Sequence, residues 1–205
     1  DVKVRAWGTE LLSAGVAGVE TPERHRMKGY ARELMESCAH FVADEGYEIT
    51  TLFGIPNFYH RYGYATICPE FEIGVDASAL VAEIGTATLG EATVRDMERV
   101  ASMYNTAHAS IDGSVVRDEG SWLGPRYGSN WDRRSRAFVR RDARGQAQAY
   151  AVIDDDLSRG SLVITDAAAA DERASVVLLA GLAEMSRSRK ASAVSFRVHP
   201  EAELG

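Results

Sequence analysis

The chain has 205 residues, of which 45% are hydrophobic and 26% are charged, and its formal net charge is −7. These proportions are typical of a globular protein, and the length allows one large domain or two small ones. A general nucleic-acid binder usually carries a basic face that neutralises phosphates. The acidic balance therefore predicts that nucleic acid is not a partner.

The sequence also argues against a membrane partner and against a metal site. No apolar run approaches the roughly 20 residues that span a bilayer, and no signal peptide is recognisable. The two cysteines, Cys38 and Cys68, are too few and too far apart for a disulfide framework or a zinc site. We therefore expect a cytoplasmic protein without a metal.

The first half of the chain predicts a strand–helix–strand unit. Alternation predicts a half-exposed strand over residues 2–6, and an apolar, glycine-rich run predicts a buried strand over 11–19. From Gly29 the apolar residues follow a helical period up to a stop near Gly46. A second buried strand is predicted over 48–55, so the two buried strands should pair in parallel. The apolar face of the helix is predicted to consist of Ala31, Leu34, Met35, Cys38, Phe41 and Val42.

Residues 57–63 predict a short helix, and residues 65–76 predict a further strand. The second half then predicts the order strand, helix, hairpin, strand, helix, strand. Its predicted features are a strand over 87–94, a capping box of Thr93 and Asp96, a hairpin over 136–154 that turns at 143–145, a strand over 161–167, a helix capped by Asp171 and a last strand over 192–199.

Both halves contain two strands, then a helix, then a strand. We therefore predict two domains, 1–80 and 84–205, with a linker near 76–85. The fold class is α/β (α+β) with mixed sheets.

The stretch "RMKGYA", Arg26 to Ala31, has the chemistry of a phosphate site. A helix that starts near Gly29 leaves its first backbone N–H groups unpaired, at the positive end of the helix dipole. A glycine lets a phosphate approach these amides, and the neighbouring Arg24 and Lys28 add positive charge. The stretch taken alone is equally consistent with a solvated basic helix start.

Two motifs in this region together resemble the Gcn5-related N-acetyltransferases (GNAT). The family signature R/Q-x-x-G-x-G/A is met by Arg26 to Ala31, and a second signature, F-Y-x-x-x-G-F/Y, is met by Phe58 to Tyr64. The resemblance covers roughly residues 2–75 and is greatest to tandem acetyltransferases related to the enhanced intracellular survival protein. It implies a mixed-sheet acetyltransferase fold with acetyl-CoA as co-substrate. The second half lacks the first signature, so we expect a degenerate acetyltransferase-like copy there.

The resemblance also implies roles for individual residues. The backbone from Arg26 to Ala31 would hold the pyrophosphate, the strand end from Gly18 to Thr21 would pair with the pantetheine arm, and Tyr59 would protonate the coenzyme A thiolate. The cofactor-binding residues are then Gly18, Val19, Glu20, Thr21, Arg24, Arg26, Met27, Lys28, Gly29, Tyr30 and Ala31.

Several alternatives stay open on the sequence. Glu20 is the carboxylate nearest to the cradle in sequence and is a candidate general base, although an exposed charge at a strand end explains it equally. The acceptor is a small-molecule or peptide amine of unidentified nature, and a homo-oligomer is possible. The competing hypotheses are a coenzyme A-binding or protein-interaction module without turnover, and an unrelated nucleotide- or sulfate-binding α/β protein. The family begins with elements that precede residue 2 here, so we expect the chain to be a segment of a longer protein.

Overall fold

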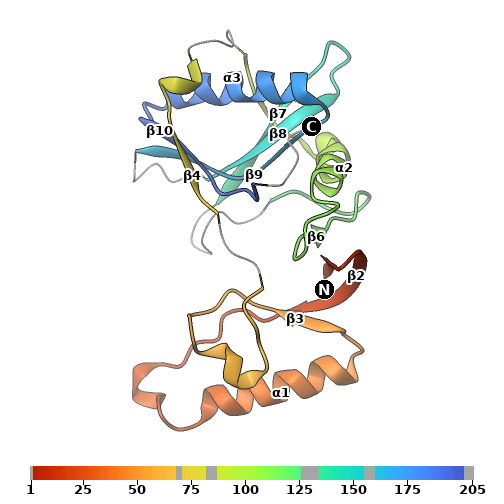
Figure 1. The fold of residues 1–205 in the computed structure, drawn as a ribbon, viewed down its shortest axis with the longest axis vertical. Helices are drawn as coiled ribbons and strands as arrows, with labels where there is room; N and C mark the ends of the chain where they lie inside the picture. The colour runs from red at the N-terminus through yellow and green to blue at the C-terminus, as the bar shows by residue number, and fades with distance from the viewer. Residues whose placement is uncertain (1, 68–70, 82–86, 126–133, 155–159, 201–205) are drawn as a thin grey trace. The chain divides into compact units, whose positions relative to one another are not determined.

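The computed structural model describes residues 2–67, 71–81, 87–125, 134–154 and 160–200. The chain forms two compact units (Figure 1). Unit 1 consists of residues 1–69 and 112–116, and unit 2 consists of residues 70–111 and 117–205. The division thus falls before the predicted linker at 76–85, and a short segment from the middle of the chain belongs to the first unit.

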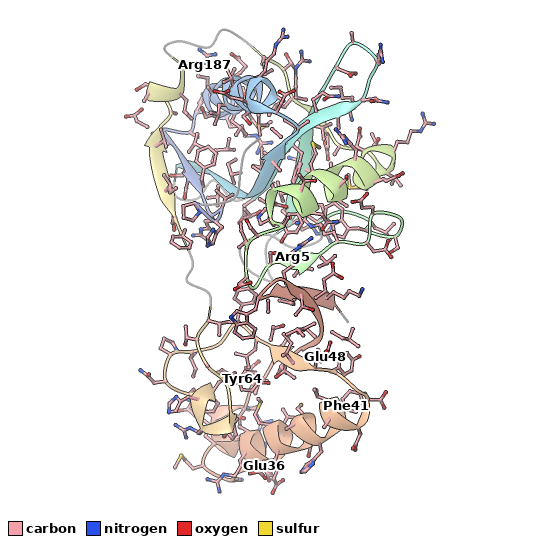
Figure 2. All side chains as sticks on the ribbon, turned by 45° about the vertical axis from the view of Figure 1, so that its right-hand side comes forward. Arg5, Glu36, Phe41, Glu48, Tyr64 and Arg187 are labelled. Carbon is pink, nitrogen blue, oxygen red and sulfur yellow. The ribbon has the colours of Figure 1, made fainter. Side chains whose placement is uncertain are left out.

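Unit 1 contains a four-stranded sheet in the order β3-β2-β1-β6. Its strands are β1 (Val2–Ala6), β2 (Thr9–Gly15), β3 (Ile49–Thr51) and β6 (Val115–Val116). β1 pairs antiparallel with β2 and with β6, whereas β2 and β3 pair in parallel. Arg5 reinforces the β1–β6 edge, because its Nη1 donates to the Val115 carbonyl at 2.9 Å (Figure 2). The strand predicted over 2–6 and the predicted parallel pair are confirmed.

Helix α1 (Tyr30–Asp44) connects the two parallel strands and runs along the sheet of unit 1 (Figure 1). Its N-cap is Gly29, in the left-handed region with a φ of 87°. The chain leaves the helix through Gly46, with a φ of 77°, and Tyr47 N–H donates to the Val42 carbonyl at 3.0 Å. This is the glycine-type helix end that the sequence predicts.

The predictions of the two buried strands in unit 1, over 11–19 and 48–55, are wrong in length and in burial. β2 stops at Gly15 instead of continuing to residue 19, and β3 spans three residues instead of 48–55. The last bond between them runs from Val16 N–H to the Thr51 carbonyl at 2.9 Å. Beyond it the two chain segments make no ladder, and Phe53 is 95% exposed. An apolar run without a neighbouring strand does not become a buried strand.

The predicted apolar face of α1 is also partly wrong. Met35 is buried, and Ala31, Cys38 and Val42 are half-buried on the same stripe. Leu34 and Phe41 are exposed instead, because they lie with Tyr30 on an adjacent stripe of the helix. Glu48 ties the end of the connection back to the sheet, since its Oε2 accepts from Leu12 N–H at 2.8 Å (Figure 2).

Unit 2 contains a six-stranded mixed sheet in the order β4-β10-β9-β8-β7-β5. Its strands are β4 (Ile73–Asp76), β5 (Gly90–Glu91), β7 (Ser135–Arg141), β8 (Ala147–Asp154), β9 (Ser161–Ala169) and β10 (Ala193–Phe196). The predicted hairpin is confirmed as β7–β8, with Gly145 N–H bonded to the Asp142 carbonyl at 3.0 Å. Of the strand predicted over 65–76, residues 68–70 lie outside the described ranges and β4 of unit 2 takes up residues 73–76, while the strand predicted over 87–94 is shortened to β5.

Two helices cover opposite faces of the unit 2 sheet, α2 (Met97–Ala107) and α3 (Glu172–Ser188) (Figure 1). β8 shows this most clearly, because Ala151 and Ile153 belong to the core cluster with α3 while Tyr150 and Val152 belong to the cluster with α2. The short 3-10 helices of the chain are η1 (Glu23–His25), η2 (Tyr59–Tyr62), η3 (Ala79–Val81) and η4 (Val94–Asp96). Across the described ranges, none of the helices combines the length and apolar character needed to cross a membrane.

Both predicted helix caps of unit 2 are confirmed. Asp96 Oδ2 accepts from the Thr93 backbone N–H at 2.7 Å and from the Thr93 hydroxyl at 2.8 Å, which forms the capping box. Asp171 Oδ1 accepts from Ala174 N–H at 2.7 Å at the start of α3. Carboxylates therefore occupy the starts of both helical segments in this unit.

Candidate functional site

The start of α1 presents a group of backbone N–H groups that are without an acceptor in the described part of the chain. Among the described residues, no hydrogen bond is made by the backbone N–H groups of 27–31, and the first N–H groups of the helix that bond back, Arg32 and Glu33, both reach the Gly29 carbonyl. A side chain at Gly29 would meet no atom within 4 Å, so the space beside this turn is open. Such an arrangement of donors at a helix start suits an anion.

The backbone before the helix is held in an unusual conformation. Met27 has a φ of 62° and its side chain is fully exposed, while Gly29 has a φ of 87°. A non-glycine residue at positive φ is uncommon and carries strain. The turn therefore depends on Gly29 for its shape, and packing does not explain it.

Basic side chains surround these amides. Arg24, Arg26 and Lys28 are exposed, and Arg24 Nε donates to His25 Nε2 at 3.1 Å. Arg26 turns back toward the strand end, where its Nε donates to the Thr21 carbonyl at 3.4 Å. His25 and Tyr30 lie close together, with ring centroids 6.2 Å apart. The structure thus brings predicted site residues from both sides of the turn together around it.

The predicted strand end from Gly18 to Thr21 is irregular chain that follows the last β2–β3 bond. Gly18 has a φ of 67°, and Glu20 is exposed and makes no hydrogen bond or ion pair to a described residue. The Thr21 carbonyl accepts from Arg26, but the other backbone groups of this segment make no hydrogen bond to a described residue and could pair with a ligand that runs along it. Within the described ranges, no hydrogen bond or ring contact joins Glu20 to Tyr59.

Tyr59 begins η2 and its ring is half-buried among other rings. Its centroid lies 5.0 Å from that of Phe58, with the ring planes at 81°, and 6.0 Å from that of Tyr64, with the planes at 70°. η2 ends at Gly63, with a φ of 87°, and Tyr64 N–H then donates to the Tyr59 carbonyl at 3.4 Å. The Tyr59 hydroxyl has no hydrogen-bond partner among the described residues. The ring is thus held by packing while its donor stays available.

Sequence reasoning missed Gly54, which lies against the ring of Tyr59 and beside Leu52. A Cβ at Gly54 would overlap the Tyr59 ring and would stand 2.6 Å from Leu52 Cδ1. The sequence carries no signal for this contact, and the structure shows that the φ of Gly54 is not positive. A glycine that the backbone does not require is there for space.

Unit 2 holds a second polar cluster, which is already fully paired. Arg117 Nη2 lies 2.6 Å from Asp166 Oδ2, and its guanidinium stacks between Tyr104 at 3.5 Å and Trp122 at 4.3 Å from the ring centroids. Burial raises the pKa of Tyr150 well above its ordinary value, so its hydroxyl stays protonated and donates to Asp166 Oδ1 at 2.9 Å. This cluster stabilises unit 2 and leaves no obvious donor for a ligand.

In the described part of the chain, no group of three or more His, Cys, Asp or Glu side chains could hold a metal ion. The donors of the site are backbone amides, guanidinium groups and an ammonium group. This donor set fits a phosphate-bearing molecule rather than a cation. Cys68 lies outside the described residues, and Cys38 is a half-buried free thiol.

Residues 1–67 match the family model of the acetyltransferase (GNAT) domain. The match includes both motifs, so the resemblance to this family that was identified from them is confirmed over these residues. No curated protein matches the chain.

Solved GNAT structures resemble the chain over nearly all of its length. A GCN5-related N-acetyltransferase from Anabaena variabilis is 16% identical with a TM-score of 0.74, and the match covers 99% of this chain and 53% of that one. A GCN5-related N-acetyltransferase from Kribbella flavida is 22% identical with a TM-score of 0.74, covering 98% and 48%. Eis1 from Mycobacterium abscessus is 14% identical with a TM-score of 0.57, covering 97% and 52%. The chain has the mixed α/β fold of these acetyltransferases and spans about half of their length.

Proposed function

We propose that the protein is an N-acetyltransferase that moves an acetyl group from acetyl-CoA to a primary amine. The observation that carries the proposal is the start of α1, where unoccupied amides at 27–31 and a positive-φ Gly29 lie within a sequence that matches the GNAT domain. The neighbouring exposed Arg24 and Lys28 supply charge for the phosphates.

Acetyl-CoA would bind by its two ends. The pyrophosphate would accept hydrogen bonds from the amides at 27–31, and the pantetheine arm would run along the segment from Gly18 to Thr21 as an added strand. The open end of the β2–β3 pair supports this placement, since the ladder stops after Val16 and Thr51. The acetyl group would then lie where the two strands separate.

The reaction would proceed by direct attack. The amine nitrogen bonds to the acetyl carbonyl carbon while the carbon–sulfur bond breaks, and the coenzyme A thiolate takes a proton from the Tyr59 hydroxyl. The proton lost by the amine leaves through a base, for which Glu20 is a candidate because it is exposed beside the same segment. The unpartnered state of the Tyr59 hydroxyl among the described residues supports its role as donor.

We infer that unit 2 is a degenerate acetyltransferase-like domain, as the predicted tandem organisation implies. Its helix α3 also links two parallel strands, β9 and β10, but begins at Asp171 instead of at a glycine. The Asp171 carboxylate already occupies Ala174 N–H. A phosphate would meet a negative charge at this position.

The test is a turnover assay with acetyl-CoA and a panel of primary amines, comparing the protein with its Tyr59→Phe and Tyr62→Phe variants. Tyr62 lies in the same short helix and packs on Phe58, with centroids 5.8 Å apart, which makes it a matched control. We expect Tyr59→Phe to lower kcat by about 100-fold or more and Tyr62→Phe to change it little. An unchanged kcat in Tyr59→Phe would refute the general-acid role.

A second candidate is a coenzyme A-binding module without turnover. It is favoured by the lack of a hydrogen bond or ion pair that would orient Glu20 among the described residues, since a general base is usually held in place by such a partner. Binding of acetyl-CoA measured by calorimetry, together with no acetylation of any amine in the panel, would support this alternative. Acetylation of any amine would exclude it.

A further inference from the structure

Gly54 lies directly against the ring of Tyr59. A Cβ added at this position would overlap Cδ2 and Cε2 of the ring and would also stand 2.6 Å from Leu52 Cδ1. Distances this short do not occur for real Cβ atoms, so the ring would have to move. The φ of Gly54 is not positive, so the backbone there is open to any residue. Glycine is needed at this position for space alone.

The other sides of the Tyr59 ring are bounded by aromatic neighbours. Phe58 meets it edge-on at 5.0 Å, and Tyr64 meets it edge-on at 6.0 Å. The hydroxyl, in contrast, has no partner among the described residues that could hold it in place. The position of the hydroxyl oxygen is therefore set by how the ring packs. Gly54 is the neighbour to which the ring comes so close that a side chain would not fit between them.

Other glycines of the chain do not share this arrangement. Gly63 has a positive φ with open space around it, so its role is conformational. A Cβ at Gly181 would collide with Leu89, which is an apolar packing contact in unit 2. Among the described glycines, Gly54 is the one whose missing side chain is replaced by the ring of a tyrosine.

We propose that Gly54 is a positioning residue for Tyr59, which places the hydroxyl where it can reach the leaving sulfur. The inference rests on the proposed acetyl transfer. A general acid must come within hydrogen-bond distance of the atom that it protonates, and a displacement of about 1 Å can cost about 100-fold in rate. The methyl group of alanine at position 54 would displace the ring and leave the backbone conformation allowed.

The kinetic test compares four proteins: the unaltered protein, Gly54→Ala, Tyr59→Phe and the double variant. We expect Gly54→Ala to lower kcat by about 10- to 100-fold, with the KM for acetyl-CoA changed by less than about 3-fold. In the Tyr59→Phe background the same substitution should have no further effect, because the hydroxyl that it misplaces is gone. Equal losses in both backgrounds would overturn the proposal.

Gly74→Ala is the control substitution. Gly74 lies in β4 of unit 2, its φ is not positive, and a Cβ there would meet nothing within 4 Å. We expect this variant to keep the kcat of the unaltered protein. A loss equal to that of Gly54→Ala would show that the kinetic effect is not specific to the packing of Tyr59, and would overturn the proposal.

Ring placement is tested separately from turnover by fluorine NMR of protein labelled with 3-fluorotyrosine. The Tyr59 resonance is assigned by its disappearance in Tyr59→Phe, and we expect it to shift in Gly54→Ala but not in Gly74→Ala. An unmoved resonance in Gly54→Ala would overturn the inference whatever the activity. Absence of acetyl transfer by the unaltered protein would instead refute the proposed function, and the catalytic role of Gly54 with it.

Discussion

Helices α1 and α3 occupy equivalent places in two different sheets, yet they begin with opposite chemistry. α1 connects the parallel strands β2 and β3, and α3 connects the parallel strands β9 and β10. α1 starts at Gly29, which has no side chain to cap it, whereas α3 starts at Asp171, whose carboxylate accepts from Ala174 N–H. A strand–helix–strand crossover does not by itself make an anion site, because the first residues of the helix decide it.

The two units also differ in how many hydrophobic side chains they bury. Among the described residues, the buried hydrophobic side chains of unit 1 are Val4 and Met35, and all the others belong to unit 2. The start of α2 repeats the pattern of α3, since Asp96 holds its capping box and pairs with Arg141 at 2.6 Å. Unit 2 therefore satisfies its helix starts internally, and unit 1 leaves its helix start open to a ligand.

The largest expected effect comes from giving α1 the start of α3. Gly29→Asp introduces a carboxylate among the backbone amides that we propose to bind the phosphates, and it forces a side chain into the left-handed region. We expect the affinity for acetyl-CoA, measured by calorimetry, to fall by about 100-fold through strain and like-charge repulsion together. Gly29→Ala, which carries the strain without the charge, is the control and should lose less. Equal affinities of the two variants would show that charge at this turn does not matter.

The reverse change removes the carboxylate from α3. Asp171→Ala leaves Ala174 N–H without its acceptor and should lower the free energy of unfolding of unit 2 by about 1 kcal/mol. Urea unfolding followed by tryptophan fluorescence in a Trp7→Phe background reports on unit 2, because Trp7 is the tryptophan of unit 1. Asp171→Asn keeps an acceptor and should stay near the unaltered value. Unaltered stability in Asp171→Ala would mean that this cap does not stabilise the helix.

The smallest expected effect is a pH dependence of unit 2 that comes from Asp96. Desolvation by burial raises the pKa of Asp96, but hydrogen bonds from Arg141 and Thr93 outweigh it and hold the pKa below its ordinary value of 3.8. A carboxylate whose pKa is lower in the folded state stabilises the fold above its unfolded pKa, and this contribution is lost as the pH falls through the folded pKa.

We therefore expect the free energy of unfolding of unit 2 to decline from about pH 5 downward, with up to about 1 kcal/mol due to Asp96. Urea unfolding between neutral and acid pH measures it, and the Asp96→Asn variant lacks this part of the decline. Parallel curves for the two proteins would contradict the assignment.

The features that could be predicted from sequence are those that local chemistry determines. Gly29, Gly46, Asp96 and Asp171 cap helices through atoms within a few residues of themselves, so their positions in the sequence were sufficient. The parallel pairing of the strands around α1 follows from the order of elements.

The features that could not be predicted depend on distant partners. The apolar runs over 11–19 and 48–55 look like long buried strands, but their length depends on whether neighbours pair with them. Leu34 and Phe41 lie on a stripe beside the covered one, but how far the cover reaches around α1 depends on elements distant in the sequence. The need for glycine at position 54 follows from the ring of Tyr59, which the fold places against it. The sequence was sufficient to predict the turn at the start of α1. It was not sufficient to predict how Gly54 packs against Tyr59.

The short strand β6 has a consequence for how unit 1 is made. Its residues, Val115 and Val116, complete the edge of the sheet beside β1, yet they lie more than a hundred residues after that strand in the chain. During synthesis from the N-terminus, the edge of β1 that pairs with β6 stays unpaired until β6 has been made. More than forty residues of unit 2 are synthesised before that point. Unit 1 is therefore the first to begin folding, but its sheet cannot be completed before residue 116 has been synthesised.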